Sequence, residues 1–114
     1  MKQKSLAVEQ VDIIFLDVGP TRGHEEDGRR PALVVSISDF TKLTGLVKVV
    51  PITNSDNPFG LIVPMPGGTK TTGSILCQHE RSLDINQRHA DYVEKCPKET
   101  VKKVLDVLDM SIHE

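Results

Sequence analysis

A long, densely charged loop between two short apolar segments constrains this fold more than any other feature of the sequence. The stretch 19–38, GPTRGHEEDGRRPALVVSIS, follows the apolar segment 11–18. It begins with the charged loop and ends in a second apolar segment, which starts at Pro31. Loops of this length inside a compact domain are usually functional or disordered. Because the charged loop leads directly into the strand-like run PALVV, we interpret it as one wall of a candidate active site.

The length and charge of the chain restrict its class. A chain of 114 residues fits one domain with one core, so we treat 1–114 as a single domain. Its net charge of −2 argues that any nucleic-acid binding uses a local cationic groove. The N-terminus has no apolar signal segment, and no apolar run is long enough to span a membrane. The spacing of Cys77 and Cys96 fits neither a zinc site nor a redox pair, which favours reduced thiols and a cytoplasmic location.

The hydrophobic pattern predicts a mainly β fold with a terminal helix. From Pro97 onward the apolar residues follow helical spacing, and a short helical turn is expected from an N-cap at Ser38 to Gly45. Tyr92 and Val93 are expected to point inward in the last strand. The fold class is therefore a small, strongly bent sheet or barrel of about five to seven strands. The expected strands are 11–18, 31–38 (with Pro31 at the first position), 46–53, 60–65 (with an edge at Pro64), 74–83 and 89–96, with a turn at 84–88. The expected helix face comprises Val101, Val104, Leu105, Leu108 and Ile112.

The first expected strand is apolar on both faces. Val11, Ile13 and Phe15 alternate with Ile14, Leu16 and Val18. A strand of this kind is buried on both sides, by the core and by a second layer. A subunit interface would supply that layer, so the pattern predicts a homodimer.

The densest group of ligand-type side chains is His24-Glu25-Glu26-Asp27. Adjacent residues on one loop rarely converge on a single ion, and no second set of His or Cys ligands accompanies them. A solvated acidic loop is the simpler interpretation. We therefore predict no metal and no other cofactor.

Arg30 and Thr53 are the more specific candidates for chemistry. Arg30 ends the charged loop at the start of a strand, where a guanidinium can fork onto phosphate oxygens and stabilise developing charge. A structural ion pair with the loop acids is equally compatible with the spacing. Thr53 ends a strand, where its hydroxyl can donate to a phosphate or only cap the turn. His79 is either a proton shuttle or a surface residue, and Cys77 is expected in the core.

Three segments together resemble the MazF/PemK (Kid) family of toxins. They are Asp12-Ile13-Ile14 with the run from Gly19 to Ser36, Val50-Pro51-Ile52-Thr53, and Arg81-Ser82-Leu83-Asp84. Their order and spacing resemble those of the family over about residues 11 to 112.

The resemblance implies an SH3-like small barrel of the CcdB/Kid/MazF type. It further implies a homodimeric, metal-independent endoribonuclease toxin that inhibits growth by cleaving single-stranded RNA and is neutralised by a MazE-like antitoxin. Attack by the 2′-OH would leave 2′,3′-cyclic phosphate and 5′-OH ends. Arg30 would stabilise the phosphorane and take part in proton transfer, Thr53 would bind the scissile phosphate, and Glu25 would help catalysis or orient the arginine. The predicted RNA-binding residues are Arg22, His24, Arg29, Asn54, Lys70, Gln78, His79 and Arg81.

Three departures from the family pattern bear on this hypothesis. The first is the run of three acids at 25–27, which would weaken phosphate affinity unless Arg22, Arg29 and Arg30 offset it. Many members have Gly-Asp where this chain has Val11-Asp12, a change that we expect to be neutral. Gln78-His79 stands where several members carry an acidic residue before Gln. The alternatives are therefore a CcdB-like inhibitor of a topoisomerase and a catalytically inactive member that binds only its antitoxin.

Overall fold

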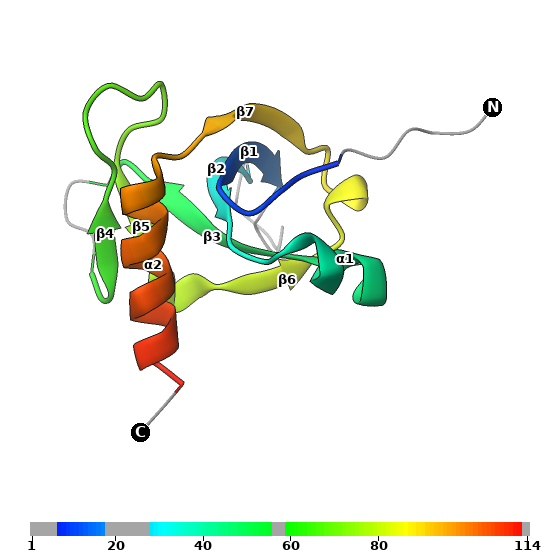
Figure 1. Cartoon of the computed structure of the whole chain (residues 1–114). Coiled ribbons are helices and arrows are strands. Elements are labelled where there is room, and N and C mark those ends of the chain that lie inside the picture. Colours follow the sequence, from blue (N-terminus) through cyan, green and yellow to red (C-terminus); the bar gives the residue numbers. More distant parts are fainter. Residues whose placement is uncertain (1–6, 18–27, 56–58, 113–114) are drawn as a thin grey trace.

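Short antiparallel strands and two α-helices make up the computed structural model, which describes residues 7–17, 28–55 and 59–112 (Figure 1). The strands are β1 (Asp12–Asp17), β2 (Arg29–Val34), β3 (Val47–Thr53), β4 (Ile62–Pro64), β5 (Ser74–Leu76), β6 (Arg81–Leu83) and β7 (Asp91–Lys95). The helices are α1 (Ser38–Thr44) and α2 (Lys98–Met110), with 3₁₀ turns η1 (Cys77–His79) and η2 (Ile85–Gln87). The mainly β fold class with a terminal helix is confirmed.

The sheet bends around β3. Its strands run in the order β4-β5-β3-β2-β1-β7, and β6 also pairs with β3. The first part of β3 lies opposite β6, with Val47 facing Leu83, whereas its end pairs with β5, with Thr53 facing Ser74. One strand thus changes partners along its length, which curves the sheet into a small barrel-like body. The edge position expected for Pro64 is confirmed, because β4 is the last strand in this order.

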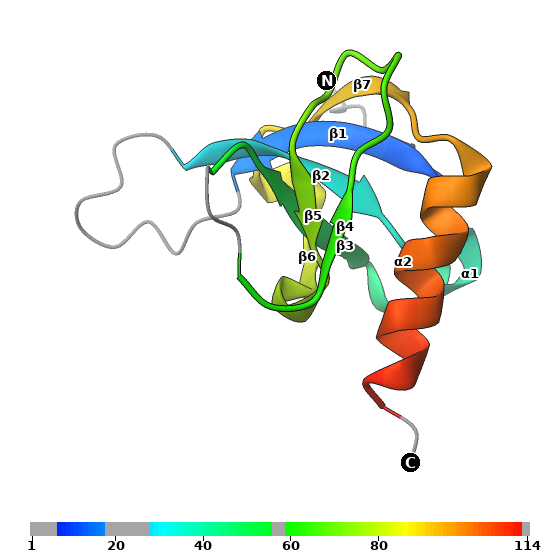
Figure 2. The same cartoon turned by 90° about the vertical axis from the view of Figure 1, so that its left-hand side faces the viewer.

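Most apolar residues of β1 are buried within this one chain, on both faces, whereas Phe15 keeps 36% of its surface exposed beside the Arg29 guanidinium. Ile13 belongs to a core cluster that also contains Val104 of α2, and that helix packs along one side of the body (Figures 1 and 2). Ile14 and Leu16 belong to a second cluster on the opposite face, which Leu83 of β6 helps to close. The expectation that β1 needs a second layer is correct, but the fold supplies that layer itself. The apolar pattern of β1 is therefore no argument for a dimer.

The segment predicted as one strand over 74–83 is instead two strands separated by η1. Both strands pair antiparallel with β3, but Ile75 lies opposite Ile52 and Arg81 lies opposite Val49, so η1 takes up the extra residues between the two paired parts. The turn is fixed by the N–H of Cys77, which donates to the carbonyl of Leu61 over 2.9 Å. Cys77 itself is buried in the core, as expected.

Several element boundaries also differ from the expectations. β2 begins at Arg29, so Pro31 occupies its third position, opposite Phe15, rather than its first. Ile37 rather than Ser38 is the N-cap of α1, without a side-chain cap, although Gly45 ends the helix in the left-handed conformation as expected.

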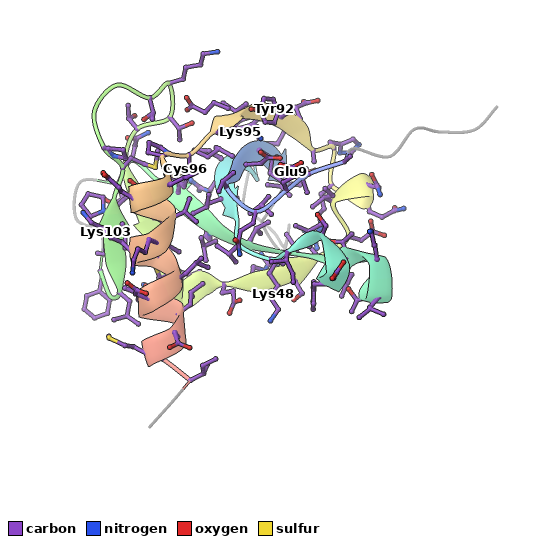
Figure 3. All side chains as sticks on the ribbon, viewed as in Figure 1. Glu9, Lys48, Tyr92, Lys95, Cys96 and Lys103 are labelled. Carbon is purple, nitrogen blue, oxygen red and sulfur yellow. The ribbon has the colours of Figure 1, made fainter. Side chains whose placement is uncertain are left out.

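The end of the chain shows three smaller corrections. Pro97 caps α2 instead of occupying its first turn, and Ile112 lies beyond the helix with 74% of its surface exposed. Tyr92 of β7 points outward, where the ammonium of Lys95 lies 5.8 Å from the centre of its ring (Figure 3). Among the described residues, no helix is long and apolar enough to cross a membrane.

Val11 has an unusual backbone conformation for a β-branched residue. Its φ is +93°, a conformation that a β-branched residue adopts only under strain. The strain accompanies a turn in which the buried carboxylate of Asp12 accepts the backbone N–H of Glu9 over 2.8 Å and Lys95 Nζ over 2.7 Å. The expectation that Val11 is a neutral replacement for glycine is therefore wrong, because the site favours a residue without a Cβ.

Candidate active site

The register of β2 and β3 directs the strand ends that bear Arg30 and Thr53 to the same side of the sheet. The observed pairing of these strands ends at Ala32 opposite Pro51. Continued by two residues, this register would set Arg30 opposite Thr53, although the paired part of β2 and β3 stops before them and Thr53 pairs with Ser74 of β5. The start of β2 and the end of β3 also lie on the same side of the molecule (Figure 2). The strand ends that carry the two principal candidates from the sequence therefore lie on the same side of the sheet.

Arg30, Thr53 and Arg81 share one face of the sheet. Alternate residues of a strand lie on the same face, and so do directly paired residues. Arg30 follows the face of Ala32, and Arg81 follows that of Leu83, both of which belong to the second core cluster. Arg30 is exposed and forms no ion pair or side-chain hydrogen bond with any residue that the structure describes. Its guanidinium is thus available to an anion at the open end of this cluster.

The turn after β3 holds Thr53 in place. Thr53 Oγ1 accepts the backbone N–H of Ser55 over 3.1 Å, so this hydroxyl caps the turn and still has its proton to donate. The side chain of Asn54 accepts the hydroxyl of Thr72 over 3.1 Å. Gly73 packs directly against the Thr53 backbone. Both interpretations of Thr53, as a turn cap and as a phosphate donor, are therefore compatible.

Arg29, in contrast, is engaged in the fold. Its guanidinium lies 4.8 Å from the centre of the Phe15 ring, and it donates to the carbonyl of His89 over 2.6 Å and to the Asp91 carboxylate over 3.1 Å. These contacts tie β2 to β7 across β1. The structure thus favours a positioning role for Arg29 over the direct RNA contact predicted for it.

The other stem of the charged loop is bonded to the same region. Asp17, the last residue of β1, donates its backbone N–H to the carbonyl of Arg88 over 2.9 Å. Its carboxylate lies 3.2 Å from Nδ1 of His89. Both ends of the loop that precedes Arg30 are therefore attached to residues 88–91.

The loop between β4 and β5 is held by one carboxylate of β7. Glu94 accepts the backbone N–H of Lys70 over 3.1 Å and that of Thr71 over 2.8 Å. Burial alone would raise the pKa of Glu94, but these hydrogen bonds, together with the Lys70 charge, lower the pKa below its ordinary value. Lys70, predicted to bind RNA, is thus presented on a loop whose backbone is fixed.

The predicted RNA-binding residues Gln78 and His79 lie in η1 and have different surroundings. The Gln78 side chain accepts the N–H of Leu61 over 3.0 Å and donates to the carbonyl of Phe59 over 2.5 Å. Its amide is therefore used to hold the segment that leads into β4, which argues against the predicted RNA contact. His79 is exposed.

Part of the predicted site lies outside the described residues, namely Glu25, Arg22 and His24. The acidic cluster of the charged loop lies there too. Within the described ranges 7–17, 28–55 and 59–112, no three His, Cys, Asp or Glu residues gather as metal ligands. Metal independence therefore stays a prediction.

The sequence matches a family of known proteins over most of its length. Residues 9–112 match the family described as PemK-like, MazF-like toxin of type II toxin–antitoxin systems. The chain belongs to this family. The endoribonuclease PemK of Escherichia coli is 34% identical over 102 residues, which cover 86% of this chain and 77% of PemK. The endoribonuclease toxin ChpB of Escherichia coli strain K12 is 33% identical, covering 90% of this chain and 91% of ChpB. The predicted toxin family, with relatives named as endoribonucleases, is confirmed.

Solved structures of the family share the fold. MazF of Deinococcus radiodurans superimposes with a TM-score of 0.82 at 30% identity, covering 95% of this chain and 98% of that one. A MazE–MazF complex from the same organism gives a TM-score of 0.79 at 27% identity, covering 95% and 97% of the two chains. The expected CcdB/Kid/MazF-like architecture is thus confirmed by MazF itself.

The sequence did not reveal the residues that support the site. Asp91 and Glu94 of β7, and Gly73 after the β4–β5 loop, stand out only once the strands are paired. The one local signal was Gly73 itself, because a glycine directly before a strand often marks a position that needs positive φ.

Proposed function

We propose that this toxin cleaves single-stranded RNA without a metal ion, using Arg30 and Thr53, with Glu25 from the charged loop. The observation that carries the proposal is the strand register, which directs the end of β2 that bears Arg30 and the end of β3 that bears Thr53 to the same side of the sheet. Arg30 is exposed and has no side-chain partner among the described residues. This pair suits a phosphodiester, because the guanidinium can fork onto two phosphate oxygens and the hydroxyl can donate to one.

The proposed reaction is an internal transesterification. The 2′-oxygen of the RNA forms a bond to the adjacent phosphorus, and the bond from phosphorus to the 5′-oxygen of the next nucleotide breaks. The proton of the 2′-OH passes to a base, for which Glu25 is our candidate, and solvent water supplies the proton that the departing 5′-oxygen takes up. Arg30 stabilises the charge on the phosphorane, a type of contribution typically worth 10²- to 10³-fold in rate. The products are a 2′,3′-cyclic phosphate and a 5′-OH.

The substrate would follow the charged and polar groups around this pair. Of the predicted contacts, we retain Arg22, His24, Asn54, Lys70, His79 and Arg81 as RNA-binding residues. Arg29 and Gln78 support the site instead, because their polar groups bond to the fold. Since the net charge is −2, RNA affinity should depend on this local set and fall steeply with added salt.

The proposal includes a MazE-like antitoxin, a homodimer and a cytoplasmic location. The related MazE–MazF complex supports the antitoxin. Leu43 of α1 and Ile112 after α2 are exposed apolar side chains, each of which a second copy of the chain would cover on dimerisation. The two free cysteines are consistent with a reducing compartment. Light scattering at micromolar concentration should give the mass of a dimer.

Mapping RNA ends in EDTA tests the proposal. The purified protein is incubated with a long single-stranded transcript, and new ends are labelled with polynucleotide kinase, with and without removal of 3′-phosphates. We expect 5′-OH ends that accept label directly and 3′ ends that are blocked as cyclic phosphate. Intact RNA, or 5′-phosphate ends, would contradict it. Growth arrest that persists in the Arg30→Ala/Thr53→Val variant would favour the topoisomerase alternative.

A further inference from the structure

We infer that β7 is the brace that sets the two walls of the candidate site relative to each other, with Asp91 and Glu94 as its positioning residues. The inference rests on the proposed function, because the walls are those that carry Arg30 and Thr53. One wall is the start of β2, and the other is the end of β3. Arg30 and Thr53 both lie outside β7. Among the described strands, β7 pairs only with β1.

The first attachment runs through Arg29. Arg30 has no side-chain partner among the described residues, so its position depends on the backbone around it. That backbone is fixed on one side by the pairing of Arg30 with Leu16 of β1. On the opposite face, the side chain of Arg29 crosses β1 over the Phe15 ring and bonds to the Asp91 carboxylate. Asp91 therefore holds the strand that presents Arg30.

The second attachment runs through the β4–β5 loop. The loop rises beside β7 in both views (Figures 1 and 2), where Glu94 binds the N–H groups of Lys70 and Thr71. Two residues later, Gly73 contacts the backbone of Thr53, and the carbonyl of Gly73 accepts the N–H of Met65 over 2.9 Å. Glu94 thus holds the loop that backs Thr53.

The two carboxylates lie three residues apart on one five-residue strand. A strand is a stiff element, so a shift of β7 would move both attachments together. Catalysis by an arginine and a hydroxyl on one phosphate depends on their relative position, and small misplacements cost up to about 100-fold in rate. A brace shared by both walls would preserve that position while RNA enters.

Steady-state kinetics separates this role from direct contact with RNA. A carboxylate that only faced the substrate would repel it, so neutralising it would lower KM and leave kcat unchanged. For a brace, Asp91→Asn and Glu94→Gln should each lower kcat about 10-fold, with KM within about twofold of the wild type. The substrate is the single-stranded transcript that the wild-type protein cleaves. The matched controls are Asp39→Asn in α1 and Asp106→Asn in α2, two exposed acids outside β7 and the segments that it holds, which should retain wild-type kinetics.

Hydrogen exchange gives a readout that does not require activity. Glu94→Gln should speed amide exchange at Lys70 and Thr71, and Asp91→Asn should speed it over residues 29–33, whereas the controls should match the wild type. Exchange that stays at wild-type rates would overturn the brace. A kcat at the wild-type value despite faster exchange would overturn its role in catalysis. If the wild-type protein cleaves no RNA, the proposed function fails, and the exchange rates still decide whether β7 holds the two segments.

Discussion

A Cβ atom built on Gly73 would stand 2.2 Å from the carbonyl oxygen of Thr53, closer than any real contact of this kind. Gly73 also has a φ of +116°, which side chains rarely adopt. The backbone of the β4–β5 loop therefore approaches the end of β3 as closely as a glycine permits, and this approach defines one wall of the site.

We predict that Gly73→Ala displaces Thr53 and lowers both stability and RNA cleavage. Backbone strain of this type costs about 1–3 kcal/mol, before the contact with Thr53 is counted. Thermal unfolding and cleavage rates measure the two effects. Gly67→Ala is the matched control, since nothing lies within 4 Å of its Cβ position, and it should stay within about 0.5 kcal/mol of the wild type. Equal behaviour of the two variants would argue against the close approach.

Val11 supplies a test in which the usual order of substitutions reverses. Glycine is ordinarily less stable than alanine by roughly 0.5–1 kcal/mol inside a strand or helix. At the φ of +93° of Val11, alanine keeps the strain and loses the same packing as glycine does. We therefore predict that Val11→Gly is more stable than Val11→Ala in chemical denaturation. A more stable alanine variant would show that Val11 is unstrained in solution.

The hydrogen bonds to Glu94 predict a loss of stability in acid. The folded pKa of Glu94 lies below its ordinary value of 4.5, so its contribution is fully present above that value and is lost as the pH falls through the folded pKa. Melting temperatures measured from pH 7 to pH 3 should therefore show the wild type and Glu94→Gln converging at the acid end. A constant difference between the two proteins across this range would contradict the assignment.

Both cysteines should be unreactive while the protein is folded. Burial raises the pKa of Cys77, and burial with the nearby charge of Glu94 raises the pKa of Cys96 to about 11. Because the thiolate is the reactive form, iodoacetamide at pH 8 should label neither residue in the native protein and both after unfolding. Rapid native labelling, followed by mass spectrometry, would show that the core around α2 opens readily.

Arg29 and Arg30 show why the sequence could predict the site only in part. The two residues are chemically identical neighbours, and the spacing made both candidates for an anion. Strand geometry places them on opposite faces, so one bonds to β7 and the other stays available. Only the position of β7 decides which arginine is bonded to the fold and which is available to an anion. That position depends on the tertiary structure.

The same distinction applies to the elements of the fold. Gly45 was predictable as the end of α1, because a left-handed C-terminal residue is a local requirement. The break at Cys77 was not, since it arises from a change of register along β3, which pairs with β5 before the break and with β6 after it. Similarly, the two apolar faces of β1 were visible in the sequence, but whether a second subunit or the chain itself covers them depends on how the sheet bends.

The central claim is that Arg30 and Thr53 act together on one phosphate. Single-turnover cleavage of a single-stranded transcript in EDTA tests it most directly, with Arg30→Ala, Thr53→Val, the double variant and Lys103→Ala. Lys103 is an exposed cation on α2 (Figure 3). Its removal therefore reproduces the loss of one positive charge at a position with no proposed role in the reaction. We predict that Arg30→Ala slows cleavage by at least roughly 100-fold, that the double variant loses less than the product of the single losses, and that Lys103→Ala cleaves normally. Cleavage by Arg30→Ala at the wild-type rate, with the same RNA ends, would contradict the account.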